Sequence, residues 1–187
     1  GRTARTVERG KQLEGGQPAH ADEYVARAGY RMKKKRHDEA LKDLEAALKA
    51  DPAQGPKGVY QAMAGIAKIR KEWKQELECY RRWAEAAPDQ FEALNAYAWA
   101  LLTCEEAQLR DPKAALPLAE KAAELTQHAN PAILDTLALS KFRNGQVAEA
   151  LATQKKAMDL LPANLQAEQR KDYEERLKEY QAANAGK

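Results

Sequence analysis

The fold is decided by ADEYVARAGYRMKKKRHDEALKDLEAALKADP at residues 21–52, because its spacing of small residues returns later in the chain. Three alanines and a closing proline follow one another there at gaps of 12, 7 and 5 residues. The same gaps occur in PAILDTLALSKFRNGQVAEALATQKKAMDLLP at residues 131–162. The residues concerned are Ala28, Ala40, Ala47 and Pro52, and then Ala138, Ala150, Ala157 and Pro162. Such internal recurrence is the signature of a repeat protein.

Two altered copies lie between these stretches. Residues 57–88 keep the spacing but place Glu76 and Trp83 where two alanines would stand. Residues 89–125 fall into register once five extra residues are allowed in the turn, which aligns Ala98, Ala115 and Ala122. Four copies at one spacing predict four repeats of the same structural unit.

Each copy predicts two helices that cross closely. The first small residue lies midway along the first helix, and the next two lie seven apart on one face of the second. Small side chains at those points let the helix axes approach. The closing proline cannot continue a helix, and Gly145 in the turn 143–145 suits a left-handed helix end.

This spacing resembles that of the tetratricopeptide repeat family, whose 34-residue unit is a helix–turn–helix with a terminal proline. The resemblance covers residues 21–162 and is closest in the first and fourth copies. It implies an all-α, right-handed solenoid of about four repeats. Residues 94–138 also resemble a region appended to larger bacterial proteins, including some kinases and thioredoxin-like proteins. We therefore expect this chain to be a fragment of a larger bacterial protein.

The predicted organisation has six parts. They are an N-terminal helix or half-repeat with a linker (1–20), a first repeat (21–54), a degenerate second repeat (55–88), a third repeat with a turn insertion (89–130), a fourth repeat (131–164), and a C-terminal capping helix with its tail (165–187).

The capping helix is predicted from one apolar stripe on a charged segment. Tyr173, Leu177 and Tyr180 recur at the spacing of a helix face. Pairs four residues apart, Asp172–Arg176 and Glu174–Lys178, are expected to support the helix. Such a helix would cover the apolar face of the last repeat.

Composition narrows the class of protein. The 187 residues are 44% hydrophobic and 32% charged, with a net charge of +3, which disfavours both a disordered chain and a dedicated nucleic-acid binder. Cys79 and Cys104 lack the spacing of a metal site or a disulfide framework. No run of 18 apolar residues exists, so no membrane span is expected, and the compartment stays open between cytoplasm and periplasm.

No motif for catalysis or cofactor binding is present in the sequence. The three histidines, His20, His37 and His128, lie far apart in predicted turns and helix ends. Ser140 has no nucleophile-elbow motif around it, and no glycine-rich stretch has the form of a phosphate-binding loop. We expect no catalytic, cofactor-binding or metal-binding residue, and a protein that is not an enzyme.

The expected function is protein–protein interaction. The resemblance places one face of each first helix on the concave side of the stack, where it would bind a peptide or helix of a partner. The groove residues predicted at helical spacing are Val25, Met32, Gln61, Lys68, Asn95, Trp99, Leu102, Asp135, Leu139 and Phe142. Trp99, Leu102, Leu139 and Phe142 form its apolar half, with the alternative that Trp99 and Phe142 belong to the core.

Two other functions remain open from the sequence. The repeats could mediate self-association or act as a spacer within a larger protein. The basic run Arg31, Lys33, Lys34, Lys35 and Arg36 could bind nucleic acid or an acidic polymer, although its cations also complement the dipole at a helix end. The run contains no interleaved aromatic residue that could stack on bases. We therefore expect these cations to complement the helix dipole rather than to bind nucleic acid.

Overall fold

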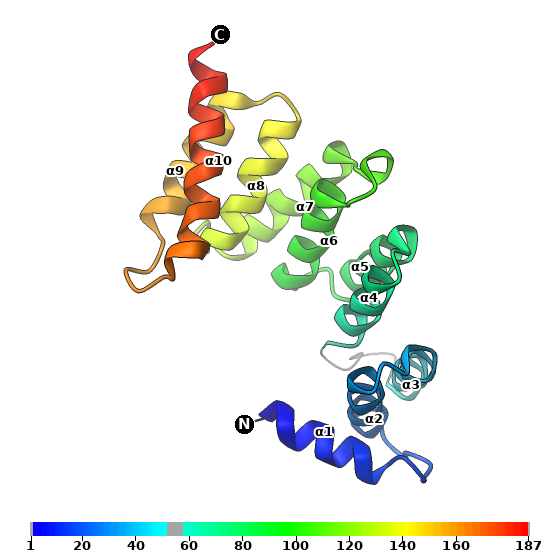
Figure 1. Cartoon of the computed structure of the whole chain (residues 1–187). Coiled ribbons are helices and arrows are strands. Elements are labelled where there is room, and N and C mark those ends of the chain that lie inside the picture. Colours follow the sequence, from blue (N-terminus) through cyan, green and yellow to red (C-terminus); the bar gives the residue numbers. More distant parts are fainter. Residues whose placement is uncertain (1, 52–57, 187) are drawn as a thin grey trace. The chain divides into compact units, whose positions relative to one another are not determined.

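Ten α-helices and one 3-10 helix make up the secondary structure, with no strand in the residues that the structure describes (Figure 1). The structure is a computed structural model that describes residues 2–51 and 58–186. The α-helices are α1 (Arg2–Gln12), α2 (Ala21–Lys33), α3 (His37–Ala50), α4 (Val59–Ile69), α5 (Trp73–Ala86), α6 (Phe91–Thr103), α7 (Pro112–Leu125), α8 (Pro131–Arg143), α9 (Val147–Asp159) and α10 (Ala167–Ala185). The 3-10 helix, η1, spans Ala107–Leu109 between α6 and α7. The all-α prediction is therefore confirmed.

The recurring alanines lie where helices of one pair cross. α2 packs against α3, α6 against α7, and α8 against α9. The alanines predicted at the crossings are at most 1% exposed: Ala28, Ala40, Ala47, Ala64, Ala98, Ala115, Ala122, Ala138, Ala150 and Ala157. A larger side chain at these points would push the two helix axes apart, which explains the selection of a methyl group.

Three of the turns within the helix pairs share one backbone motif. The turn after α2 has Lys35 at φ 59°, and the turns after α4 and α8 have Lys71 at φ 58° and Gly145 at φ 81°. In each, two N–H groups donate back to the last turn of the helix, as when Arg36 N–H bonds to the Arg31 carbonyl at 2.9 Å. This is the Schellman arrangement, which favours glycine at the left-handed position. The glycine predicted to end α8 is therefore confirmed, while two lysines occupy the equivalent positions.

These turns provide a stability prediction. Lys35→Gly should raise the free energy of unfolding by about 0.5–1 kcal/mol, because glycine adopts the left-handed region without steric cost. Gly145→Ala should lower it by a similar amount. Urea denaturation followed by circular dichroism measures both changes. Lys33→Gly is the matched control, and it should destabilise the protein because Lys33, the last residue of α2, has helical geometry. A Lys35→Gly variant that is as unstable as Lys33→Gly would contradict the assigned turn geometry.

Gly10 lets α1 lie close to α2. A Cβ built on Gly10 would stand 2.1 Å from the Ala26 carbonyl oxygen and 2.9 Å from the Cβ of Tyr30. Both distances are shorter than van der Waals contact, so any side chain at residue 10 would force the two helices apart. Glycine has a low helix propensity, but residue 10 must lack a side chain for α1 to pack this closely against α2.

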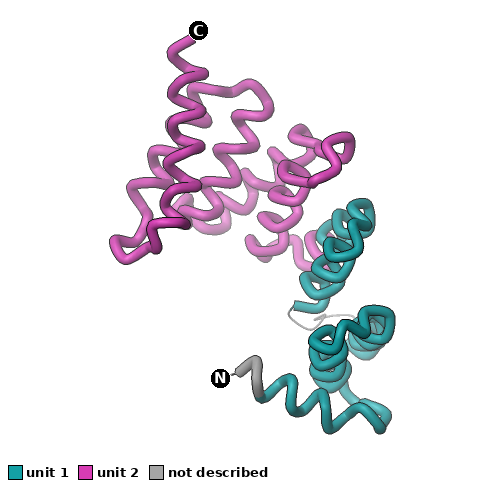
Figure 2. The backbone as a smooth tube through the Cα atoms, in the orientation of Figure 1, with its two compact units in different colours: residues 1–82 teal, residues 83–187 magenta. Residues whose placement is uncertain are grey.

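The chain divides into two compact units, residues 1–82 and residues 83–187 (Figure 2). The division falls within α5. Unit 1 has a core of alanine, leucine, valine, isoleucine and methionine side chains from α2, α3 and α4, together with Cys79 of α5. The predicted end of the first repeat at Pro52 lies outside the described residues.

An ionic network ties α1, α2 and α3 together in unit 1. Asp43 is 2% exposed, and its carboxylate accepts hydrogen bonds from Arg27 at 2.7 Å and from Arg31 at 2.8 Å. Glu14 accepts from Arg31 at 3.0 Å and also from Arg36. These hydrogen bonds hold the pKa of Glu14 below its ordinary value. The network therefore engages both arginines of the predicted basic run, which leaves only its three lysines for an anionic partner.

Unit 2 contains the helices that form the candidate site. α6 contacts α7 and α8, and α8 and α9 are followed by α10, which packs against both (Figure 1). The segment between α6 and α7, where the sequence predicts an insertion, contains η1, and Arg110 there donates to the Cys104 carbonyl at 2.7 Å. α8 begins at Pro131, with the Asn130 side chain accepting from two backbone N–H groups of its first turn. These local features position α6, α8 and α10 around one cavity.

A polar cavity between α6, α8 and α10

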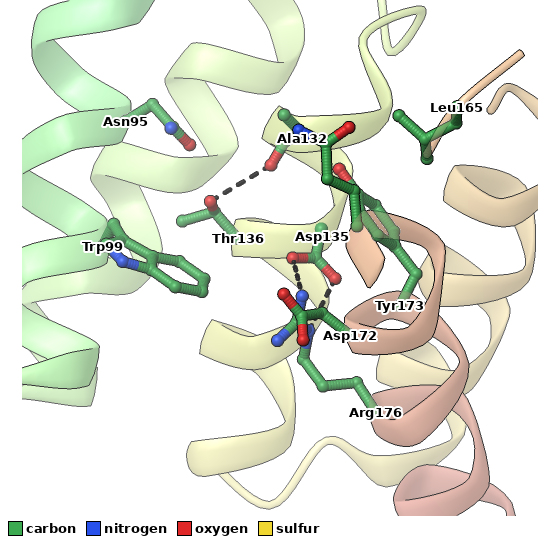
Figure 3. Close-up of a pocket in the computed structure, with 10 residues that line it drawn as sticks. Asn95, Trp99, Ala132, Asp135, Thr136, Leu165, Asp172, Tyr173 and Arg176 are labelled. Carbon is green, nitrogen blue, oxygen red and sulfur yellow. Dashed lines mark hydrogen bonds and ion pairs between the residues drawn. The ribbon is translucent and has the colours of Figure 1, made fainter. Parts of the chain in front are cut away.

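Unit 2 contains a cavity of about 440 Å³ that is open to solvent and is lined by three helices and the segment before α10 (Figure 3). α6 contributes two side chains, α8 three and α10 four. The lining residues are Asn95, Trp99, Ala132, Asp135, Thr136, Leu165, Gln169, Asp172, Tyr173 and Arg176. The wall combines two aromatic rings with amide, carboxylate, hydroxyl and guanidinium groups.

Helical spacing explains why these side chains converge. Asn95 and Trp99 lie four residues apart, so both project from one face of α6. On α10, Gln169, Tyr173 and Arg176 follow one another at gaps of four and three residues, and Asp172 lies on the same face. The cavity therefore lies where one face of α10 meets the faces of α6 and α8 that carry the other lining residues.

The ion pair between Asp135 and Arg176 joins α8 to α10. Arg176 Nε donates to Asp135 Oδ1 at 2.8 Å and Nη2 donates to Oδ2 at 2.6 Å, a bidentate geometry (Figure 3). Gln154 of α9 donates from Nε2 to Asp135 Oδ1, also at 2.8 Å. Three helices thus converge on one carboxylate that is 5% exposed.

Burial and hydrogen bonding act in opposite directions on this pair. Burial raises the pKa of the Asp135 carboxyl above its ordinary value, while the hydrogen bonds from Arg176 and Gln154 act to lower it. Burial also works against the charge of Arg176, but the hydrogen bond to Asp135 raises the pKa of the guanidinium overall. Arg176 therefore stays protonated, and its charge is neutralised by Asp135 when that carboxylate is ionised.

Two aromatic rings hold the Arg176 guanidinium in place. Its central carbon lies 5.7 Å from the centroid of the Trp99 ring and 5.7 Å from that of Tyr173. Cation–π contacts of this kind restrict the arginine to one orientation. Trp99 nevertheless remains 36% exposed, so part of its ring is open to the cavity and to solvent.

Two polar groups of the wall have no partner within the described residues. Asn95 Oδ1 is buried and accepts no hydrogen bond there. Asp172 lies exposed at the cavity and, among residues 2–51 and 58–186, makes neither a hydrogen bond nor an ion pair. The sequence predicted an Asp172–Arg176 pair, but Arg176 forms its ion pair with the buried Asp135 instead, and Asp172 acts on Arg176 only through its charge at longer range. Asp172 is thereby left as an available carboxylate.

The predicted groove residues fall into four groups. Asn95, Trp99 and Asp135 line the cavity. Gln61 and Lys68 are exposed on α4 in unit 1, whereas Val25 and Met32 pack against the unit 1 core. Leu102 and Leu139 are only 2% and 6% exposed, and Phe142 stacks on Tyr180 with ring centroids 4.5 Å apart.

The expected apolar half of the groove is therefore corrected. Leu102 is buried on α6, which packs against α7 and α8, and Leu139 is buried on α8. Phe142 is partly buried and packs against the cluster of Ala138, Ala150 and Tyr180. Trp99, which is 36% exposed, is the most open side chain of that group. An aromatic or aliphatic residue at helical spacing is more often core than surface, and three of these four follow that rule.

The sequence analysis missed the contribution of α10. Leu165, Gln169, Asp172, Tyr173 and Arg176 all line the cavity, although this segment was predicted only as a cap. One signal was present in the sequence, since Tyr173 belongs to the predicted apolar stripe. The polar residues beside that stripe gave no indication that they would face α8.

Two kinds of feature are absent from the described residues. In the described ranges, no three histidine, cysteine, aspartate or glutamate side chains gather closely enough to hold a metal ion. Across the same residues, none of the helices combines the length and the apolar character needed to cross a membrane.

Solved structures of repeat proteins resemble this chain along most of its length. YrrB, described as a tetratricopeptide repeat protein with an unusual peptide-binding site, matches with a TM-score of 0.65 and 16% identity, covering 98% of this chain and 84% of its own. MamA from Desulfovibrio magneticus RS-1 matches at 0.61 and 18%, covering 89% and 96%.

A third match is Cut9 in the APC/C hetero-tetramer Cut9–Hcn1, with a TM-score of 0.61 and 18% identity over 84% of this chain and 29% of that one. A scan against protein-family models and a search of curated proteins found no match. The structural matches show that this chain has the tetratricopeptide repeat fold.

Proposed function

We propose that this chain, which has the tetratricopeptide repeat fold, is a protein-interaction scaffold that binds a peptide or helix segment of a partner protein in the cavity between α6, α8 and α10. The observation that supports this most directly is the open face of Trp99. A tryptophan that is 36% exposed beside a cavity of about 440 Å³ is the kind of side chain that dominates binding energy at protein interfaces.

The rest of the wall suits a peptide in its chemistry. Amide groups of Asn95 and Gln169 and the carboxylate of Asp172 provide hydrogen-bonding partners next to the aromatic surface. A peptide presents alternating side chains and backbone N–H and C=O groups, and such a ligand needs both apolar contact and polar partners. YrrB, which shares the fold, is described as having a peptide-binding site, and this is consistent with the proposal.

The cavity is also rigid enough to select a ligand. Arg176 is fixed by a bidentate ion pair and by two rings, and Asp135 is fixed by α9 as well as α10. A preorganised wall loses little conformational entropy on binding, which favours affinity from a small contact area.

Substitution of Trp99 tests the proposed function. Trp99→Ala should weaken binding of a partner captured from the source organism by at least about 30-fold, because truncation of a central interface tryptophan costs roughly 2 kcal/mol or more. The measurement is an affinity pulldown followed by titration of the captured protein. The matched control is Leu125→Ala, since Leu125 is 42% exposed at the end of α7 and does not line the cavity.

Three outcomes of this experiment are informative. Loss of binding in the Trp99 variant alone supports the proposal, provided circular dichroism shows an unchanged helix content. Equal binding by both variants would move the interaction to another surface and contradict it. Capture of a second copy of the chain through Trp99 would identify the partner as the protein itself.

A further inference from the structure

We infer that the occupant of this cavity is a basic segment of a partner protein, which places a lysine or arginine side chain against Asp172 and the open face of Trp99. This inference rests on the proposed function, because it names the chemistry of the partner at the same site. It follows from the charges and the unsatisfied acceptors of the wall.

The charged lining residues sum to one negative charge when both carboxylates are ionised. Asp135 and Arg176 are paired with each other at 2.6 Å and cancel, and Asp172 adds a carboxylate that makes no ion pair or hydrogen bond in the described part of the chain. The remaining lining residues are uncharged. A cation entering the cavity would therefore meet one uncompensated negative charge, in surroundings less polar than bulk water.

The unsatisfied groups point to a donor-rich ligand. The exposed Asp172 carboxylate is an acceptor without a donor among the described residues, whereas Asn95 Oδ1, which is also unpaired there, is itself buried. A lysine ammonium or an arginine guanidinium carries only donors, so either group could bind the Asp172 carboxylate. Backbone N–H groups beside that side chain supply further donors for the same wall.

Trp99 adds an attraction for the same class of ligand. The ring already has one guanidinium, that of Arg176, 5.7 Å from its centroid, and its exposed part offers a further π surface. A cation over a tryptophan ring is attracted by the ring quadrupole. An aliphatic stem leading to the charge would also cover apolar ring surface.

An acidic segment fits these observations poorly. Arg176 is the cation of the wall, and both of its bonded nitrogens face Asp135. An incoming carboxylate would compete with this buried ion pair and would also approach the unpaired Asp172. Like charges placed next to each other in an interface oppose binding.

Selection from a random peptide library tests the inference. Twelve-residue peptides displayed on phage would be selected against the whole chain and, in parallel, against Asp172→Lys, Asp172→Asn and Trp99→Ala. We expect the unsubstituted chain to enrich peptides with lysine or arginine, and we expect Asp172→Lys to lose that preference. A synthetic copy of the best peptide should bind Asp172→Asn about 5-fold more weakly, the upper end for a partly exposed ion pair.

A matched control separates local from general electrostatics. Glu168→Lys has the same change of charge on the first turn of α10, but Glu168 does not line the cavity. It should leave the preference for basic peptides in place. Raising the salt concentration should weaken binding of the basic peptide to the unsubstituted chain more than binding to Asp172→Asn.

The outcomes distinguish this inference from the proposed function. Peptides that depend on Trp99 but carry no basic residue, or that ignore Asp172, would overturn the inference and leave the function standing. Enrichment of acidic peptides would also overturn it. If no selected peptide depends on Trp99, both the inference and the proposed function are contradicted.

Discussion

Replacement of Tyr180 by alanine is expected to lower the free energy of unfolding by about 3–4 kcal/mol, the cost of removing a large buried aromatic side chain. Tyr180 is 0% exposed and lies at the crossing of Ala138 and Ala150, so its ring fills the space between α8, α9 and α10. The ring also stacks on Phe142 at a centroid distance of 4.5 Å. Its loss would leave a cavity and detach α10 from the pair it covers. Urea denaturation measures the change.

The conservative change at the same position isolates the role of the ring. Tyr180→Phe should alter stability by less than about 1 kcal/mol, because the Tyr180 hydroxyl is buried and has no hydrogen-bond partner among the described residues. Burial raises the pKa of this phenol, so it remains neutral throughout the working pH range. If Tyr180→Phe were as damaging as Tyr180→Ala, the stabilisation would come from the hydroxyl and the packing account would be wrong.

Replacement of Asp135 by alanine is expected to cost about 3 kcal/mol, because it leaves the Arg176 guanidinium partly buried without its counter-ion. The same change removes one of the two acceptors of Gln154 Nε2. Since Asp135 connects α8 to both α9 and α10, the C-terminal helix should become more mobile. Thermal and urea unfolding measure the stability, and hydrogen exchange of α10 measures the mobility.

A double-mutant cycle tests whether the loss of stability in Asp135→Ala comes from its ion pair with Arg176. Asp135→Ala combined with Arg176→Ala should be less destabilising than the sum of the single changes by about 1 kcal/mol or more, since the second change removes the unpaired charge. Additive effects would show that Asp135 acts through packing alone. The surface pair Lys171–Glu175, at 3.8 Å, is the control and should show coupling below about 0.5 kcal/mol.

The helical architecture could be predicted from the sequence because it depends on local rules. The spacing of Ala28, Ala40 and Ala47 reports where helices cross, and every such alanine in the described repeats is buried. Gly145 ends α8 as glycine commonly does. These features involve residues close together in sequence, where periodicity alone determines the outcome.

The cavity could be predicted only in part. Asn95, Trp99 and Asp135 were identified because they lie on a stripe of helices whose orientation the repeat fixes. The Asp135–Arg176 pair joins residues 41 apart, and nothing in the local pattern of α10 favoured it over the Asp172–Arg176 pair. Burial determines which carboxylate Arg176 pairs with. A buried carboxylate such as Asp135 is costly without a paired cation, whereas Asp172 at the surface is solvated by water.

The most direct test of the account is hydrogen–deuterium exchange of the whole chain with and without a peptide that depends on Trp99. Binding in the cavity predicts added protection in α6, α8 and α10, within residues 91–103, 131–143 and 167–185. The helices of residues 2–50 should exchange at unchanged rates. Protection confined to those N-terminal helices, or absent from α6 and α10, would contradict the assignment of the cavity as the binding site.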